Sequence, residues 1–107
     1  MANAPDVNEA NFQEEVLDVA VPVLADFWAP WCGYCQRLSP ILDELAGEAG
    51  DKFKVVKINV DQNRSLAQKY GVMSLPTMIL FKEGEQAEKI VGFLPKANLE
   101  ARIKPHL

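Results

Sequence analysis

The chain has 107 residues, enough for one domain with its own hydrophobic core, and we expect residues 1–107 to form that single domain as a monomer. Hydrophobic residues make up 49% of the sequence and charged residues 24%, which excludes a disordered chain, and no segment approaches the roughly 20 apolar residues of a membrane-spanning helix. Eleven Lys and Arg against fifteen Asp and Glu give a net charge of −4 without a basic stripe, which argues against a nucleic acid ligand.

The first residues show no sign of a targeting segment. Residues 1–12 lack both the basic cluster and the apolar block of a secretory signal, so we expect a cytoplasmic protein. Val7 and its neighbours offer a first strand, which Pro5 would confine to a sheet edge. Asn8 is suited to cap a first helix. The inward side of that helix would carry three apolar residues: Phe12, Val16 and Leu17.

The middle of the chain alternates between strand and helix patterns. Residues 22–29 are almost continuously apolar, as in a central strand covered on both faces, and Asp26 is the exception. Residues 34–49 carry apolar side chains at helical intervals, and Pro40 is expected to kink this helix near its first turns. Residues 53–60 are rich in β-branched side chains, which indicates another strand.

The last third of the chain predicts a short helix, a hairpin and a final helix. Gly71 closes the short helix. Residues 77–81 are expected to turn at Gly84 into a return strand that begins at residues 89–91, and Pro95 stands near the first position of the last helix. A crossover between strands implies parallel pairing early, and a tight turn implies antiparallel pairing late. The sequence therefore predicts an α/β fold with helices on both faces of a mixed sheet.

The only two cysteines, Cys32 and Cys35, stand three positions apart where the strand at residues 22–29 gives way to a helix. Thiols of the cytosol are kept reduced, so such a pair is more typical of a catalytic or metal site than of a structural disulfide. At the helix cap, the sulfur of Cys32 would face free backbone N–H groups, which favour a thiolate. Cys32 would then attack a substrate disulfide, and Cys35, one turn further and less accessible, would resolve the mixed disulfide.

Three neighbours of the cysteines are candidates for contact or packing. Gly33 lets a substrate backbone approach the sulfur, and it also suits a tight turn. Trp31 is expected to offer an apolar landing surface beside the thiols, whereas Trp28 is expected to pack in the core.

Two charged residues fall inside strand patterns, and the sequence leaves alternatives open for both. Burial would raise the pKa of Asp26, and a carboxyl beneath the thiols could take the proton from Cys35; the alternative is a hydrogen-bonded structural acid. The strand pattern favours a solvent-facing position for Lys57, but beside Asp26 in the sheet it could instead hold the carboxylate charge.

A Cys-x-x-Cys pair is also half of a common zinc site. The second half is missing, because His106 is the only other nitrogen ligand and stands near the end of the sequence. A metal would need ligands shared between two chains, so we expect no metal site. Before the strand at residues 77–81, Pro76 removes an N–H, and a cis bond there would place the backbone of Leu75 beside Cys32.

These motifs together resemble the thioredoxin family over nearly the whole chain. The matching segments are residues 26–33 (DFWAPWCG), Cys35 with Pro40, residues 57–61 (KINVD), 70–72 (YGV), 75–77 (LPT) and Gly92. The resemblance implies the thioredoxin fold, with a central mixed sheet of four to five strands flanked by four α-helices. It also implies Cys32 as nucleophile, Cys35 as resolving thiol, Asp26 as proton carrier with Lys57 as its neighbour, and a cis Pro76.

The same resemblance implies partners. Family members bind extended substrate chains against four residues that this sequence also has: Trp31, Leu75, Pro76 and Gly92. They carry electrons on the cysteine pair without a bound cofactor, and a flavin-containing thioredoxin reductase recharges them with NADPH.

One departure lies inside the active motif, where the family usually has proline and this chain has Tyr34. Tyrosine restores an N–H in the first helical turn that can stabilise the thiolate of Cys32, which predicts a weaker reductant. Glutaredoxin-type motifs also carry a tyrosine beside the second cysteine, which leaves open the reductase that recharges the protein.

The leading hypothesis is a general protein-disulfide reductase. A disulfide oxidant or isomerase would be a close relative that differs from a reductase only in the reduction potential of its cysteine pair. A binding module would use the substrate face without turnover, and a metal carrier would hold stoichiometric zinc or iron.

Overall fold

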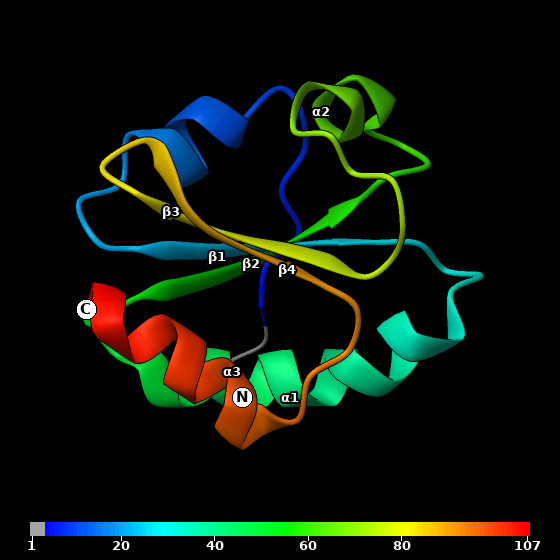
Figure 1. Ribbon diagram of the computed structural model, residues 1–107. Helices are drawn as coiled ribbons and strands as arrows, with labels where there is room; N and C mark the ends of the chain where they lie inside the picture. The colour runs from blue at the N-terminus through cyan, green and yellow to red at the C-terminus, as the bar shows by residue number, and fades with distance from the viewer. Residues whose placement is uncertain (1–3) are drawn as a thin grey trace.

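The computed structural model describes residues 4–107, in which a four-stranded sheet lies between two layers of helices (Figure 1). The strands are β1 (Val23–Trp28), β2 (Lys54–Asn59), β3 (Thr77–Lys82) and β4 (Glu85–Val91). Their order across the sheet is β2-β1-β3-β4. β1 pairs parallel with β2 and antiparallel with β3, and β3 pairs antiparallel with β4. The predicted mixed sheet, parallel early and antiparallel late, is confirmed.

Helical segments cover both faces of this sheet, as predicted. Helices α1 (Gly33–Ala49) and α3 (Lys96–Ile103) lie on one face, below the sheet in Figure 1. The segments η1 (Gln13–Leu17) and α2 (Arg64–Lys69) lie on the other face, and a 3-10 turn, η2 (Lys104–His106), follows α3. None of the helices within residues 4–107 is both long and apolar enough to cross a membrane.

The strand expected around Val7 is a single bridge, so the sheet has four strands and not five. Asp6 pairs with Lys57 of β2, where the Val7 N–H donates to the Lys57 carbonyl at 2.8 Å and the Lys57 N–H donates to the Pro5 carbonyl at 2.9 Å. Pro5 has no N–H to extend this ladder, and the chain then turns at Asn8.

The first helical segment begins later than predicted and is wound as a π-helix instead of an α-helix. Asn8 does not cap it directly. The Asn11 N–H donates to Asn8 Oδ1 at 3.1 Å and the Asn8 N–H donates to Asn11 Oδ1 at 2.8 Å, so the two side chains close a turn before the helix. The predicted inward side is confirmed, because Phe12 and Val16 are buried and Leu17 packs against the same cluster.

The alternation of side chains along β1 decides what lies under the cysteines. Val23 and Phe27 pack with the apolar cluster on the η1 and α2 face, whereas Leu24 packs with α1 and α3. Because side chains alternate in a strand, Asp26 points to the same face as Leu24, toward α1. The hairpin between β3 and β4 turns at Glu83 and Gly84 with positive φ angles of 55° and 78°, which confirms the predicted turn. The predicted start of the return strand at residues 89–91 is wrong, because β4 begins at Glu85, where this tight turn lets Glu85 pair with Lys82 at once.

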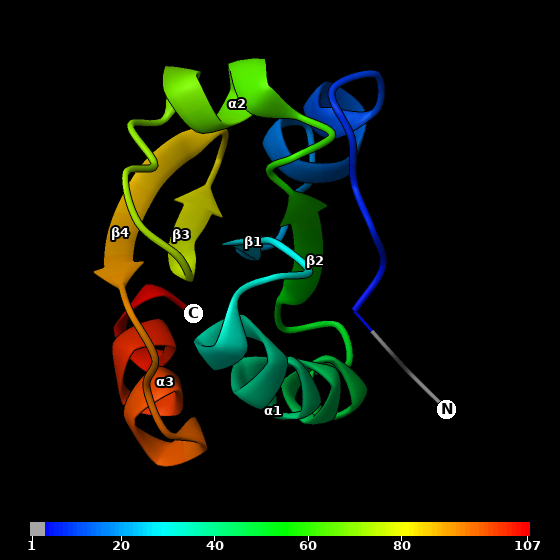
Figure 2. The ribbon, with the colours of Figure 1, turned by 90° about the vertical axis from the view of Figure 1, so that its right-hand side faces the viewer.

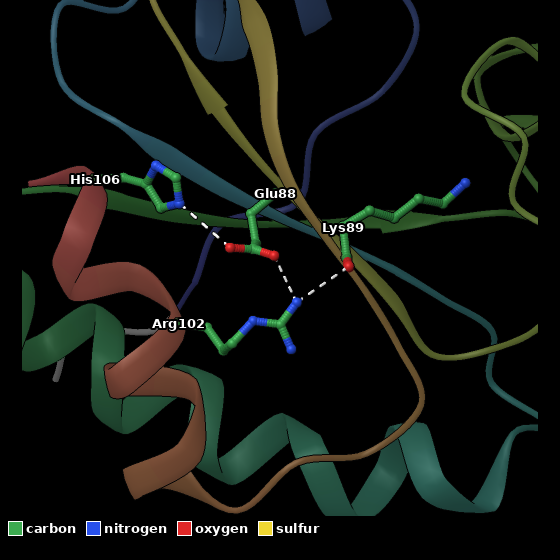
Figure 3. Close-up of polar contacts among 4 residues, drawn as sticks. All are labelled: Glu88, Lys89, Arg102 and His106. Atoms are coloured by element: carbon green, nitrogen blue, oxygen red, sulfur yellow. Dashed lines mark hydrogen bonds and ion pairs between the residues drawn. The ribbon is translucent and has the colours of Figure 1, made fainter.

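A charged cluster ties the end of the chain to β4 (Figure 3). Glu88 accepts a hydrogen bond from Arg102 Nη2 at 2.5 Å, and its second oxygen lies 3.3 Å from His106 Nε2. The hydrogen bonds from Arg102 and then from His106 lower the pKa of Glu88 below its ordinary value. The C-terminal turn η2, which contains His106, lies at the end of the sheet opposite the loop between β1 and α1 (Figure 1).

Candidate active site

Three loops converge at the end of the sheet where β1 leads into α1. Figure 2 faces this end and shows that loop together with the loops before β3 and after β4. Leu75, from the loop before β3, packs against Cys32 and Cys35. The Gly92 N–H donates to the Pro76 carbonyl at 2.8 Å, which joins the other two loops to each other. These contacts bring sequence-predicted residues from three separate segments to one place.

Cys32 is the N-cap of α1, as its position predicted. Its backbone is extended, with φ −90° and ψ 112°, and its Sγ accepts a hydrogen bond from the Cys35 N–H at 3.2 Å. The two cysteines form a disulfide, with their Cα atoms 5.2 Å apart. Cys32 is 8% exposed and Cys35 is 3% exposed, so solvent reaches Cys32 more easily. In the reduced form, free N–H groups of the first turn would face a thiolate at residue 32.

Asp26 lies beneath the cysteines in a cavity of about 350 Å³ that Cys35, Trp28 and Lys57 also line. The carboxyl is 2% exposed, and its Oδ1 has no hydrogen-bond partner within residues 4–107. Burial raises the pKa of Asp26 to about 7, because loss of water disfavours the charged form more than the attraction of Lys57 favours it. No group within residues 4–107 donates a hydrogen bond to Oδ1, so the structure gives no support at this oxygen to the alternative of a hydrogen-bonded structural acid.

Lys57 is the β2 partner of Asp26 in the sheet register and lies on the same face. Its Nζ donates to Ser39 Oγ at 2.6 Å and to Asp43 Oδ1 at 2.9 Å, and it is not hydrogen-bonded to Asp26. The solvent-facing position favoured by the strand pattern is wrong, because α1 covers this side chain and binds its charge. Lys57 acts on Asp26 through space.

Sequence reasoning missed the two α1 residues that hold Lys57. Ser39 and Asp43 follow Cys35 at successive intervals of four, so all three lie along one side of α1. That spacing was the available signal, but only the packing of α1 over β2 shows that this side covers Lys57.

The two tryptophans occupy different environments. Trp31 is 70% exposed, and its Nε1 donates to Asp61 Oδ2 at 3.0 Å, which fixes the orientation of the ring. Trp28 is half-buried, packs against the cysteine cluster and lines the Asp26 cavity, so it lies at the border of the core and not inside it. Asp61 was missed as a site residue, although it stands in the KINVD motif.

The backbone settings of Gly33, Pro40, Pro76 and Gly92 differ from one another. A Cβ at Gly33 would project into open space and the residue has no positive φ, so the turn does not require glycine there. Pro40 lies inside α1. The Leu75–Pro76 bond is cis, as the resemblance implied. Gly92 has φ +96°, a conformation that favours glycine.

Tyr34 stands in the first turn of α1, and the residue is 59% exposed. Within residues 4–107, no group of three or more His, Cys, Asp and Glu side chains is placed to hold a metal ion.

Comparison with known proteins bears on both the fold and the site. The family model described as Thioredoxin matches residues 3–105. Thioredoxin 1 of Synechococcus elongatus is 46% identical over 107 residues, which is all of both chains. Thioredoxin of Bacillus subtilis is 56% identical over 85 residues, 79% of this chain and 82% of that protein. Thioredoxin M-type, chloroplastic, of Chlamydomonas reinhardtii is 46% identical over 106 residues, 99% of this chain and 76% of that protein.

The cysteine pair and the matches to known proteins indicate the same chemistry, which is thiol-disulfide exchange. The redox group is the Cys32–Cys35 disulfide at the start of α1, and proteins of this kind need no bound cofactor to carry the electrons. The chain therefore belongs to the thioredoxin family and is a protein-disulfide reductase with a Cys-x-x-Cys redox pair.

Proposed function

We propose that the protein reduces disulfides by two successive exchanges, in which Cys32 attacks first and Cys35 completes the reaction. The observation that carries this order is the position of the Cys32 sulfur at the cap of α1, where it accepts the Cys35 N–H. The cap environment stabilises negative charge on this sulfur, and the thiolate is the attacking form of a cysteine. Cys35 is more buried and lacks that position.

The reaction balances in electrons and protons. The Cys32 thiolate bonds to one sulfur of the substrate disulfide, and the other substrate sulfur leaves as a thiolate. Cys35 then loses its proton and attacks the Cys32 sulfur, which releases the second substrate thiolate. The substrate gains two electrons, and the protein is left with the Cys32–Cys35 disulfide.

We assign the proton transfer to Asp26. Its carboxyl shares a cavity with Cys35, and with a pKa of about 7 it can accept a proton near neutral pH and release it again. The positive charge of Lys57, which Ser39 and Asp43 hold in place, limits the rise in the pKa of Asp26.

The substrate surface in this proposal surrounds the Cys32 sulfur. It consists of six residues from the three converging loops and the start of α1: Trp31, Gly33, Tyr34, Leu75, Pro76 and Gly92. Support comes from the exposed Trp31 and Tyr34 rings, the open space beside Gly33, and the packing of Leu75 on the cysteines. An extended substrate segment fits such a surface because its backbone can approach the sulfur closely.

As a member of the thioredoxin family, the chain acts on disulfide substrates and is reduced by a thioredoxin reductase. We further propose that this reductase is a flavoprotein that uses NADPH. We also propose that residues 1–107 act as one monomeric domain in the cytoplasm.

The order of attack can be tested by alkylation of the fully reduced protein at neutral pH with limiting iodoacetamide. We expect Cys32 to be modified much faster than Cys35 and faster than an unstructured peptide thiol, because only a capped sulfur ionises readily. Peptide mapping by mass spectrometry gives the rate at each position. Equal rates at Cys32 and at the peptide thiol would overturn the proposed attacking role.

A separate prediction concerns the effect of Tyr34, in the active motif, on the reduction potential of the cysteine pair. Tyr34→Pro removes one backbone N–H from the first turn of α1, and we expect the reduction potential to fall by about 30 mV, the equivalent of one charge-assisted hydrogen bond to the thiolate. Equilibration with dithiothreitol or glutathione buffers measures the potential. Tyr34→Ala is the matched control, because it removes the ring but keeps the N–H and should leave the potential near its original value. An unchanged or higher potential in Tyr34→Pro would contradict this account.

A further inference from the structure

An arginine beside the redox site contacts two aromatic rings. The Cζ atom of Arg37 is 5.7 Å from the ring centre of Tyr34 and 5.7 Å from the ring centre of Phe93. Both distances fall within the range of a cation–π contact. We call Tyr34, Arg37 and Phe93 the arginine clamp.

The clamp is attached to two of the elements that form the site. Tyr34 and Arg37 are three positions apart on α1, so their side chains are neighbours on one side of the helix. Phe93 follows Gly92 in the loop after β4 and packs partly into the core, while Gly92 is bonded to the Pro76 carbonyl. The rings therefore hold the guanidinium in place next to the substrate surface.

The charge of Arg37 is not balanced by an acidic side chain within residues 4–107. Within residues 4–107, Arg37 forms none of the ion pairs, whereas Arg102 is paired with Glu88. Arg37 is exposed, and its side-chain N–H groups donate to no side chain or carbonyl within the described part of the chain. Aromatic rings contact the flat faces of a guanidinium, which leaves the N–H edge free. That edge matches a carboxylate in shape and charge.

We propose that the arginine clamp selects disulfide partners that carry an Asp or Glu side chain near the attacked cysteine. Charge complementarity favours this occupant, because Arg37 is a local cation beside Tyr34 and Phe93 that forms no ion pair within residues 4–107, although the net charge of the chain is −4. The inference rests on the proposed attack by Cys32, which brings the partner segment over the start of α1. It makes Arg37 a specificity-determining residue of the reductase.

The test uses two oxidised peptides that differ only in having Glu or Gln next to one cysteine. The second-order rate constant for reduction of each peptide by the reduced protein gives a Glu-to-Gln preference. We expect a preference of about three- to fivefold at low salt, the range of a partly exposed ion pair, and a smaller preference at high salt. In Arg37→Gln the preference should fall to about one.

Lys52→Gln is the matched control, because it removes the same charge from an exposed lysine in the turn before β2, at the other end of the sheet. It should keep the full preference. Tyr34→Leu should reduce the preference, since the guanidinium then loses one of its two rings. A preference that survives Arg37→Gln, or an unmodified protein that reduces both peptides equally, would overturn the proposal. Reduction of the Gln peptide reports the underlying exchange reaction separately, so failure of the two ideas can be told apart.

Discussion

Replacing Cys32 by serine is expected to lower insulin-disulfide reduction, with dithiothreitol as electron donor, to the rate of dithiothreitol alone. A serine hydroxyl does not ionise at neutral pH and cannot form the mixed disulfide, so the first exchange is lost. Cys35→Ser should also lose turnover, but for a different reason. Its Cys32 can still attack, and the resulting mixed disulfide with the substrate should accumulate.

Non-reducing electrophoresis and intact mass distinguish these outcomes. Cys35→Ser should give a covalent adduct that dithiothreitol releases, and Cys32→Ser should give none. The control is the unmodified protein, in which the adduct should be short-lived because Cys35 resolves it. An adduct that forms at Cys35 in the Cys32→Ser variant would contradict the proposed order of attack.

Asp26→Asn is expected to make the folded protein more stable above pH 7. The pKa of Asp26 is about 7 in the folded state against a model value of 3.8, so between these values the folded state holds a proton that the unfolded state has released. Stability is therefore lost as the pH rises from about 4 to about 7, by about 4 kcal/mol. The asparagine variant avoids this loss, but its buried amide leaves donors unpaired, so we expect a net gain of about 1 to 3 kcal/mol at pH 8.

Urea unfolding at pH 4, 6 and 8 measures this difference, which should grow with pH and reach its full value above pH 7. Asp51→Asn is the control, since it removes the same charge from an exposed turn and should show no such trend. A difference between Asp26→Asn and the unmodified protein that is the same at all three pH values would contradict the buried, uncharged carboxyl.

The same variant should slow the reduction of disulfides. In the unmodified protein, the rate of mixed-disulfide resolution should rise with pH through an apparent pKa near 7 as Asp26 becomes able to accept a proton. In Asp26→Asn that step of the profile should disappear, and the rate at pH 8 should fall on the order of tenfold to a hundredfold. Loss of the rate without loss of the pH step would point to a packing defect instead.

Local patterns were sufficient to predict the elements that carry the site. The apolar run at residues 22–29 became β1, and the cap position of Cys32 followed from the helical spacing after it. The strand around Val7 failed because a single bridge depends on the pairing of Asp6 with Lys57, a contact far along the chain that no local pattern encodes.

The surroundings of Asp26 and Lys57, the two charged residues inside strands, could not be predicted from the sequence. Because side chains alternate between the two faces of a strand, the side chain of Lys57 must lie on one face of β2. The sequence does not show that Ser39 and Asp43 of α1 cover that face. For Asp26 the conflict between an acid and an apolar strand was visible, whereas the size of its pKa change depends on burial by elements from several parts of the chain. Likewise, the contact of Arg37 with the ring of Phe93 joins α1 to the loop after β4, and no local sequence pattern predicts it.

The position of the chain's last residues has a practical consequence. The C-terminal turn, held to β4 through Glu88, lies at the end of the sheet opposite the loop between β1 and α1 (Figure 1). Leu107 is exposed there. A molecule immobilised on a bead or an electrode through residue 107 would therefore be oriented with the loop between β1 and α1, and so the Cys32 end of the redox pair, toward the solution.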